Sequence, residues 1–278
     1  TQGMVCHETY KDENNNWISP EELISKDGDK YLKKDPLKKI KVGPSESMSK
    51  SKKNTIDPEN IINNYGADSV RLFILSDSPP EKDVQWSEEG IIASFKFIQK
   101  LWTLNEKILE EINKNHSEDN SDEFIRFTNK FIKKISDNLE NFHYNIIVAN
   151  LHEMYSFLNK EINKGYKKET ILENYKKILI TMMPILPHLS NECFEIVKTN
   201  SDEVKWPSYD ERQITEETKV IVIQINGKKR GLINTKLNLE ENGIFNLVKR
   251  DQNMNKYLLD KEVKKKIYIK NKLMNIII

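Results

Sequence analysis

The sequence predicts a multi-domain α+β protein in which a helical bundle separates two regions that contain strands. Three observations lead to this prediction. Apolar residues recur at helical spacing over 86–205, a β-branched run with an Asn-Gly pair dominates 219–278, and short apolar patches alternate with turn-forming residues over 1–85. The polar segment 206–218, which opens with Trp206-Pro207, is expected to link the last two regions.

The first region is expected to contain strands followed by two short helices. Apolar patches at Gly3-Met4-Val5 and Ile40-Lys41-Val42 suggest strands, with a Lys-rich loop or hairpin between them. Asp57 is placed to cap a helix over 58–65 that has Pro58 in its first turn, and a second helix is expected beyond Gly66. The stretch 43–54 is expected to be a mobile loop.

The middle region is expected to be a bundle of four or five helices. Four apolar stripes recur at spacings of three and four residues, and a short helix over 189–197 completes the set. Ser121 is expected to open the second helix, and Pro184, followed by Pro187, to kink or stop the fourth. Trp86 and Trp102 are expected to be buried anchors. The stripes begin at Ile91, Phe124, Ile147 and Ile171.

The last region is expected to be a small α+β unit. Val220–Ile225 is a β-branched run, and the Asn226-Gly227 pair that follows is a strong signal for a type I′ hairpin. Leu232-Ile233 would lie in the returning strand. A helix over 240–250 and two further strands over 263–269 and 273–278 complete the unit.

Composition excludes several classes of protein. With 37% hydrophobic residues and a mean hydropathy of −0.68, the chain has no apolar run near the ~18 residues of a membrane helix. No secretory signal is visible at Thr1–Tyr10, and Cys6 and Cys193 are too far apart for a paired metal motif. Adjacent Cys6 and His7 cannot easily reach one metal ion. We therefore expect a cytoplasmic protein without a metal site or membrane partner.

The formal net charge of +1 conceals strong local charges. Residues 26–53 hold ten lysines against four acids, and residues 219–278 hold fourteen Lys or Arg against five acids, whereas 54–218 is acidic. Lysine enrichment alone could reflect solvated faces, but acids thin out only in the two basic blocks. A local positive field attracts phosphates, so a polyanionic partner is a reasonable hypothesis.

The stretch Gly43–Asn54 interleaves hydroxyl residues with lysines, a combination that can wrap a polyphosphate. Hydroxyls and backbone amides donate hydrogen bonds, and ammonium groups neutralise charge. A lysine that closes on departing pyrophosphate stabilises the transition state more than the bound nucleotide. Composition alone is a weak signal here, because Ser/Lys clusters are common in solvated loops.

Two consecutive blocks resemble class I aminoacyl-tRNA synthetases. Ser47-Met48-Ser49-Lys50-Ser51 resembles the Lys-Met-Ser-Lys-Ser signature, and Lys52–Pro58 is its usual continuation. Tyr65–Phe73 looks like the helical stem-contact segment that follows the signature in that class. The resemblance implies that 1–85 is the end of a Rossmann-type catalytic domain and that 86–205 is an anticodon-binding bundle.

The ends of the chain resemble bacterial-type leucyl-tRNA synthetases in particular. Val222–Gly231 is similar to the hairpin of their terminal domain, Lys265–Ile277 to its closing strands, and Gln2–Val5 to the stretch that re-enters their catalytic domain. The zinc knuckle, metal knob or coiled coil typical of isoleucyl, methionyl and valyl enzymes does not appear. A sibling valyl or isoleucyl synthetase is the alternative within the class.

This resemblance implies an ATP-dependent ligase that uses Mg²⁺ and attaches leucine to tRNA(Leu). Lys50 is implied as the catalytic residue, with Met48, Ser49, Lys50 and Ser51 binding ATP. The resemblance also implies that 219–278 binds tRNA, with Lys228, Lys229 and Arg230 as phosphate contacts. Leucyl enzymes as a group make little use of the anticodon to recognise their tRNA.

The chain departs from the family pattern in two ways. Ser47 stands where the first signature lysine is usual, and Lys52 or Lys53 is a hypothetical substitute for it. No His-x-Gly-His motif occurs, so the sequence corresponds to a carboxyl-terminal portion: a truncation, a partial gene product or one subunit of a split enzyme. Alone it is expected to be inactive. A tRNA-binding module without catalysis is the alternative function.

Overall fold

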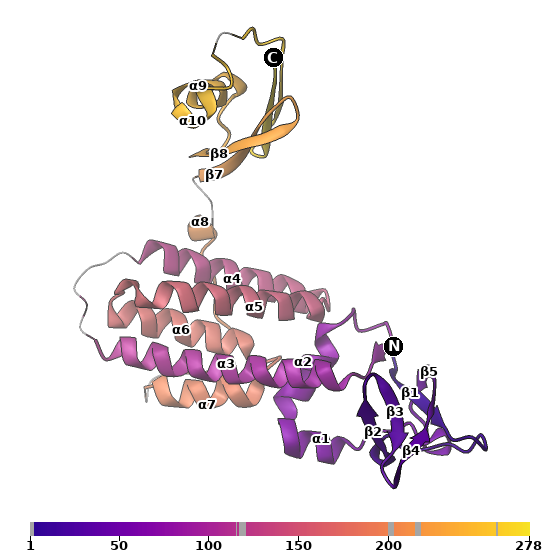
Figure 1. Ribbon diagram of the computed structural model, residues 1–278. Helices are drawn as coiled ribbons and strands as arrows, with labels where there is room; N and C mark the ends of the chain where they lie inside the picture. The colour runs from indigo at the N-terminus through magenta and orange to yellow at the C-terminus, as the bar shows by residue number, and fades with distance from the viewer. Residues whose placement is uncertain (1–2, 115, 117–120, 200–202, 215–217, 260) are drawn as a thin grey trace. The chain divides into compact units, whose positions relative to one another are not determined.

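The structure is a computed structural model that describes residues 3–114, 116, 121–199, 203–214, 218–259 and 261–278 (Figure 1). The chain divides into two compact units, Thr1–Gln213 and Ile214–Ile278, and each has its own hydrophobic core. The division falls inside the polar segment 206–218. No helix in the described part of the chain is long and apolar enough to cross a bilayer.

A three-stranded sheet opens the first unit. Its central strand β1 (Val5–Lys11) pairs antiparallel with β5 (Lys41–Ser47) and parallel with the two-residue β6 (Val84–Gln85). The expectation of a loop from residue 43 was wrong, since Ser45 and Ser47 lie opposite Glu8 and Cys6 in the ladder. Gly, Pro and Ser favour turns, but pairing with β1 overrides that local preference.

The Lys-rich stretch between these strands forms a sheet of its own. A 3-10 turn, η1 (Pro20–Glu22), precedes three antiparallel strands in the order β2-β3-β4. Their bounds are Leu23–Lys26, Asp29–Leu32 and Asp35–Lys39. Of the two predicted possibilities, a loop or a hairpin, the structure has the antiparallel strands, with three strands instead of two.

Two short helices follow as predicted. The side chain of Asp57 accepts a hydrogen bond from the Glu59 amide and caps α1 (Pro58–Tyr65). Gly66, at φ +81°, separates α1 from α2 (Ala67–Ser76) in a conformation that L side chains rarely adopt.

Five helices form the bundle in the described part of the chain, in agreement with the four or five that were predicted. Their buried side chains make one large cluster. The third helix runs on into a 3-10 turn, η3 (Ile162–Lys164), and ends at Gly165 in the left-handed conformation. The helices are α3 (Glu88–Ile112), α4 (Asp122–Glu140), α5 (Tyr144–Glu161), α6 (Lys168–Met182) and α7 (Pro187–Val197).

Two details of the bundle differ from expectation. Ser121 precedes α4, but its side chain makes no capping hydrogen bond. Trp86 is buried beside Phe73, as predicted, whereas the prediction for Trp102 was wrong because 38% of its surface is exposed. Trp102 lies on the outer side of α3. Leu101 and Leu104, which belong to the apolar stripe, are buried in the core instead.

The segment that leads out of the first unit packs along α4. The indole N–H of Trp206 donates to Ser136 Oγ at 2.9 Å, and the Asp210 amide donates to Asn129 Oδ1 at 2.7 Å. The ammonium group of Lys133 lies 5.1 Å from the centre of the Tyr209 ring. A short helix α8 (Glu211–Ile214) follows. These contacts hold residues 206–210 against the bundle.

In its described part, the second unit is a four-stranded sheet with two helices; the strands and the helix over 240–250 were predicted, whereas the second, shorter helix was not. The strand order is β8-β7-β10-β9, and only β7 and β10 run parallel. Asn226 and Gly227 both have positive φ, which confirms the predicted hairpin turn. The elements are β7 (Thr218–Ile225), β8 (Lys228–Lys236), α9 (Glu241–Arg250), α10 (Gln252–Asn255), β9 (Lys265–Ile269) and β10 (Leu273–Ile277).

Candidate functional site

The signature-like stretch begins where β5 ends. The Met48 amide donates to the Val5 carbonyl at 3.4 Å, which extends the ladder by one bond. The Met48 side chain packs against the cluster that contains Val84 and Trp86. Met48 therefore fixes the start of the loop on the core, and the residues after it leave the sheet.

Ser49 to Lys53 form a tight exposed turn. Ser49 is extended, Lys50–Lys52 form the 3-10 turn η2, and Lys53 adopts the left-handed conformation at φ +52°. The amides of Lys52 and Lys53 donate to the carbonyls of Ser49 and Lys50, each at 3.2 Å. The hydroxyls of Ser49 and Ser51 lie 2.7 Å apart, and the Lys50 side chain is exposed. The turn thus presents two hydroxyls and one ammonium group together.

Asn54 follows the turn, closes it and is fully buried. Its Oδ1 accepts a hydrogen bond from the Ser49 amide at 2.8 Å. Its Nδ2 donates to the carbonyls of His7 and Glu46, both at 3.2 Å, and to that of Ser47 at 3.4 Å. One side chain therefore joins the turn to both β1 and β5. Sequence reasoning did not select Asn54 as a functional residue, although it stands in the quoted continuation of the signature.

His7 completes this connection from β1. Its Nδ1 lies 3.2 Å from the Asn54 carbonyl oxygen, which can only accept, so the imidazole donates. Burial lowers the pKa of the His7 imidazole, although the hydrogen bond to Asn54 acts in the opposite direction. The neutral ring that results is a structural support of the turn. No local pattern in the sequence connects positions 7 and 54.

The remaining lysines of the loop have different environments. Lys52 forms an ion pair with Glu46 at the end of β5, and both side chains are about one-third exposed. Lys53 is exposed at the end of the turn. Lys52 and Lys53 are the two hypothetical substitutes for the first signature lysine. The charge of Lys52 is thus partly neutralised by Glu46.

A second polar cluster ties α2 to the bundle. Asp68, at the start of α2, is buried and accepts hydrogen bonds from Arg71 Nη1 at 2.7 Å and from His188 Nδ1 at 2.9 Å. It also accepts from the Leu189 amide at 2.9 Å. The first turn of α7 is thereby held against α2. His188 thus has a structural role.

A cavity of about 1160 Å³ has His7 among its lining residues. Residues of β1, β2, α2, α3 and α5 line it, His152 among them, and Trp86, between β6 and α3, lines it as well. The His152 ring stacks on Phe97 with the ring centres 3.8 Å apart, which is a packing role. None of the lysines at 50, 52 and 53 is among the residues that line this cavity. His7, which supports the charged turn from β1, also lines the cavity.

Cysteines and carboxylates do not gather into a metal centre in the described part of the chain. No three His, Cys, Asp or Glu side chains there lie close enough together to hold a metal ion. Cys6 is partly exposed and Cys193 is buried, and both are free thiols.

The three basic residues of the second unit's hairpin do not share one face. A bulge after Ile223 places Lys229 opposite Gln224, and Lys228 opposite Ile225. Arg230 turns towards the helices, where its guanidinium lies 4.4 Å from the centre of the Tyr257 ring. The hairpin therefore directs positive charge to both sides of the sheet.

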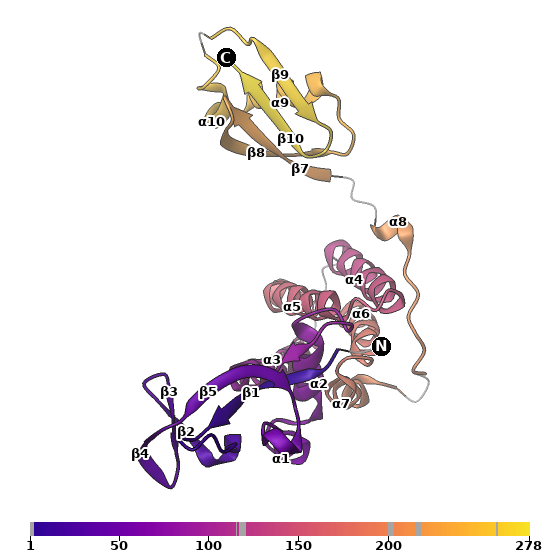
Figure 2. The same ribbon diagram turned by 90° about the vertical axis from the view of Figure 1, so that its right-hand side faces the viewer.

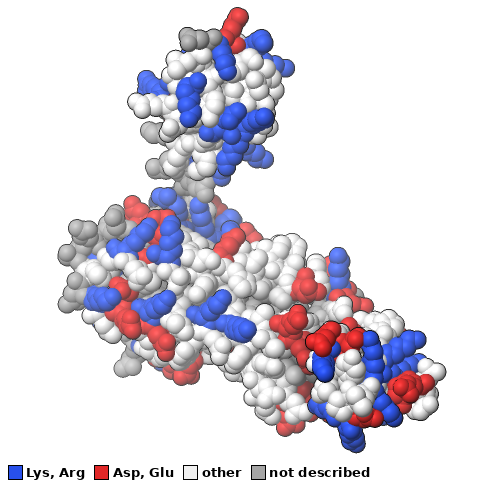
Figure 3. All heavy atoms as spheres, in the orientation of Figure 1, with Lys and Arg blue, Asp and Glu red and all other residues white. Residues whose placement is uncertain are grey.

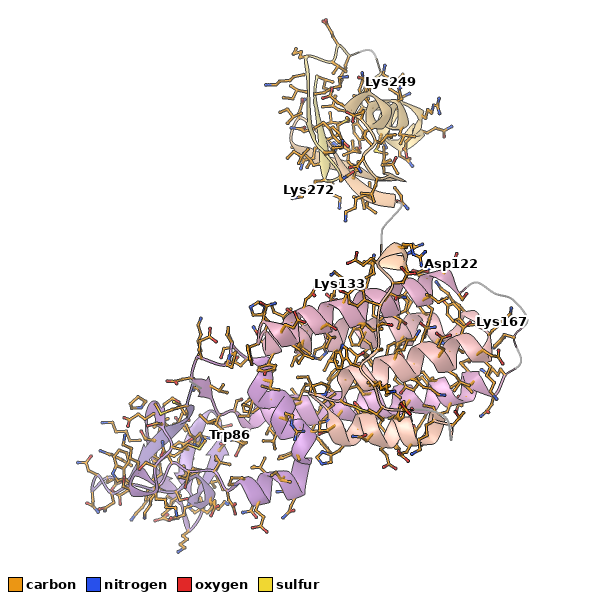
Figure 4. The ribbon with its side chains drawn as sticks, turned by 180° about the vertical axis from the view of Figure 1, so that it is seen from behind. Trp86, Asp122, Lys133, Lys167, Lys249 and Lys272 are labelled. Atoms are coloured by element: carbon orange, nitrogen blue, oxygen red, sulfur yellow. The ribbon has the colours of Figure 1, made fainter. Side chains whose placement is uncertain are left out.

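Basic side chains are spread over the rest of this unit. Figure 3 shows them outnumbering acidic ones on the visible face, and Figure 4 marks Lys249 on α9 and Lys272 between β9 and β10. Lys249 and Lys266 both lie 4.6 Å from the centre of the Phe245 ring, which orders their side chains. A polyanion would therefore meet positive charge on more than one face.

Comparisons with known proteins agree with this geometry. Residues 40–87 match the family model for class I tRNA synthetases of the I, L, M and V group, and residues 121–245 match that for the anticodon-binding domain of tRNA ligases. The leucine–tRNA ligases of Orientia tsutsugamushi (strain Boryong) and Bartonella quintana (strain Toulouse) are 39% and 35% identical to the chain over its whole length. The chain belongs to the leucyl-tRNA synthetase family.

The chain spans about one third of the length of these relatives, 33% in each case, and corresponds to a carboxyl-terminal part of a leucyl-tRNA synthetase. The fold agrees as well. A solved ternary complex of the Agrobacterium radiobacter K84 leucyl-tRNA synthetase with tRNA and LeuAMS matches 83% of this chain and 31% of that one, with a TM-score of 0.67 at 23% identity. Both relatives are leucine–tRNA ligases, which favours the leucyl family over the valyl and isoleucyl alternatives.

Proposed function

We propose that this chain supplies the ATP-closing loop and the tRNA-binding parts of a leucine–tRNA ligase. Such an enzyme activates leucine with ATP and transfers it to tRNA(Leu). The observation that carries the proposal is the exposed turn Ser49-Lys50-Ser51, fixed at the end of β5 by Met48 and Asn54. A solvated Ser/Lys loop would not need a fully buried asparagine beneath it.

Lys50 is the proposed catalytic residue. When the leucine carboxylate attacks the α-phosphorus of ATP, the bond to pyrophosphate breaks and negative charge grows on the departing group. An ammonium group placed there stabilises the transition state more than the ground state. The Ser49 and Ser51 hydroxyls would donate to phosphate oxygens, and the Met48 backbone would lie near adenine.

The donor set of the turn fits phosphate and does not fit a bare metal ion. Ammonium and hydroxyl groups complement phosphate oxygens, whereas Mg²⁺ takes oxygen ligands and is usually bound through few carboxylates and the substrate phosphates. We therefore assign Mg²⁺ to the ATP phosphates. We also assign the leucine pocket to the part of a leucyl-tRNA synthetase that this chain does not span. The proposed location is the cytoplasm.

The other regions are proposed to bind tRNA. Residues 1–85 would carry the loop and the stem-contact helices, 86–205 would form the anticodon-binding bundle, and 219–278 would form a terminal tRNA-binding domain. Lys228, Lys229 and Arg230 are the proposed phosphate contacts of that domain. Such contacts position a nucleic acid without reading its sequence.

The test combines this chain with the amino-terminal remainder of a leucine–tRNA ligase, supplied as a separate polypeptide. Leucine-dependent exchange of pyrophosphate into ATP is expected from the mixture, and Lys50→Ala is expected to lower its rate about 10²-fold or more. Lys34→Ala serves as the control, because it removes another exposed lysine, from the β3–β4 turn.

Two results would contradict the proposal. Leucyl-adenylate formation by this chain alone would mean that the chain contains a complete active site, whereas the proposal assigns the leucine pocket to the part that it does not span. Equal exchange rates for Lys50→Ala and Lys34→Ala, in a mixture that is active, would remove Lys50 from the reaction. Binding of tRNA without any exchange activity in the mixture would support the alternative, a tRNA-binding module without catalysis.

A further inference from the structure

The cavity of the first unit lies where its strands meet the start of the bundle. Figures 1 and 2 both show β1 beside α2 and the beginning of α3, and residues of all three elements line the cavity. Its volume of about 1160 Å³ is ample for a small organic molecule, because ligand pockets usually measure about 300–1,000 Å³. Ser49, Lys50 and Ser51 are not among its lining residues, so the proposed reaction does not account for it.

The charged side chains of this cavity are mostly acidic. Among the described residues that line it, four carboxylates stand against one ammonium group, that of Lys30. Two imidazoles line it as well, and burial lowers the pKa of both, so they add no positive charge at neutral pH. The cavity therefore attracts a cation and repels an anion. The carboxylates belong to Glu8, Asp77, Glu88 and Glu89, and the imidazoles to His7 and His152.

The walls of the cavity also offer apolar and aromatic surface. Leu72, Phe97 and Val148 line it, and so do Phe73 and Trp86, whose rings meet edge to face with their centres 5.3 Å apart. Aromatic rings beside carboxylates favour organic ammonium ions. A bare metal ion fits less well, because no three His, Cys, Asp or Glu side chains in the described ranges lie close enough together to hold one.

Trp86 carries a hydrogen-bond donor that the protein does not use. Figure 4 labels this residue where the strands meet the helices, and its side chain lines the cavity although it is only 8% exposed. The indole N–H has no hydrogen-bond partner among the described residues. A buried donor without a partner is unfavourable, so an oxygen atom that accepts from it would be bound tightly. The ligand should therefore carry a hydroxyl or carbonyl oxygen besides its positive charge.

We propose that this cavity binds an organic ammonium compound with an apolar body and a hydroxyl or carbonyl oxygen. The ammonium group would lie among the carboxylates, the oxygen would accept from the Trp86 indole, and the apolar body would pack on Phe73 and Phe97. The proposal does not depend on the function proposed above.

The site adjoins the signature turn through His7. The Nδ1 atom of His7 donates to the Asn54 carbonyl oxygen, which leaves Nε2 of the neutral ring as an acceptor. An ammonium group that donates to Nε2 would hold this ring in place, and with it the base of the turn. Occupation of the cavity should therefore slow hydrogen exchange in a peptide covering residues 45–56.

The experiment titrates phenylalaninol into the full chain and measures binding by calorimetry. This probe has an ammonium group, a hydroxyl oxygen and an apolar ring. N-acetylphenylalaninol lacks the ammonium group, and phenethylamine lacks the hydroxyl. Each is expected to bind about tenfold more weakly than phenylalaninol, because each loses one of the two polar contacts.

Two variants locate the site. The double variant Glu88→Gln with Glu89→Gln should weaken phenylalaninol binding about tenfold and make it less sensitive to salt, because two charges are lost. Glu106→Gln with Glu110→Gln is the matched control, since it removes two exposed carboxylates of the same helix that do not line the cavity. Trp86→Phe keeps an aromatic ring without the N–H, so it should weaken binding of phenylalaninol and leave that of phenethylamine unchanged.

Three results would overturn the proposal. The first is the absence of saturable binding of phenylalaninol to a chain that circular dichroism shows to be folded. The second is equal binding by the Glu88/Glu89 variant and its control, which would place the probe elsewhere and which can be read even if Trp86→Phe fails to fold. The third is protection of residues 84–94 from hydrogen exchange by the amino-terminal remainder alone, with no competition from phenylalaninol, which would show that polypeptide fills the cavity. Pyrophosphate exchange in the mixture could still succeed in each case, so the proposed function would stand.

Discussion

The side-chain oxygen of Asn54 holds the backbone of Ser49 at 2.8 Å, which joins the two ends of the signature turn. The same side chain donates to carbonyl oxygens of both flanking strands. Every hydrogen-bonding group of this buried amide is thus used, and the turn cannot move away from the sheet without breaking several bonds at once. The position of Lys50 is therefore set by a fully buried residue.

We expect Asn54→Asp to loosen the turn. An aspartate keeps the oxygen that faces Ser49 but puts a second oxygen against three carbonyls, and a buried polar group left unsatisfied costs about 1–3 kcal/mol. Hydrogen exchange in a peptide covering residues 45–56 should accelerate, while exchange in α3 stays unchanged. Asn63→Asp, at an exposed position of α1, is the control. Equal rates of hydrogen exchange in the two variants would show that the Asn54 side chain does not hold the turn in place.

Acidification should weaken the same region through His7. Burial holds the pKa of this imidazole below its ordinary value near 6.5, so the unfolded chain binds the proton more readily than the folded one. Its contribution to stability is complete above pH 6.5 and is lost as the pH falls below that value towards the lowered pKa. Thermal unfolding between pH 7.5 and 5 should show the loss, and it should be smaller in His7→Asn, which can still donate to Asn54. An identical pH dependence in both proteins would contradict this role.

Local sequence patterns predicted most of the helices and the terminal hairpin. The stripe beginning at Phe124 and the Asn226-Gly227 turn depend on neighbours within a few residues, and both were confirmed. The predictions for residues 43–47 of β5 and for Trp102 were wrong. The first is decided by pairing with β1 and the second by how α3 packs in the bundle, and neither is a local property of the sequence. The contact of His7 with Asn54 spans 47 residues, and no periodic pattern carries information over that distance.

The buried carboxylate of Asp68 should be worth more to stability than any surface ion pair of the bundle. Asp68→Asn leaves the Arg71 guanidinium without its anionic partner and weakens the bond to the Leu189 amide, so we expect a loss of about 2 kcal/mol. Glu173→Gln removes an exposed pair with Lys177 and should cost less than about 0.5 kcal/mol. Chemical unfolding followed by circular dichroism measures both. Equal losses would mean that α7 is held by its apolar contacts alone.

The ion pair between Glu46 and Lys52 predicts how the loop responds to the absent first lysine. While Glu46 neutralises Lys52, the substitution Lys52→Ala should slow pyrophosphate exchange much less than Lys50→Ala does. Glu46→Gln should free the Lys52 ammonium group for the phosphates and lower the KM for ATP a few-fold in the mixture with the amino-terminal remainder. The double variant Glu46→Gln with Lys52→Ala should lose that gain, because the freed charge is then gone. A gain that survives in the double variant would show that Glu46 acts by its own negative charge on ATP, and that Lys52 does not substitute for the lysine that Ser47 replaces.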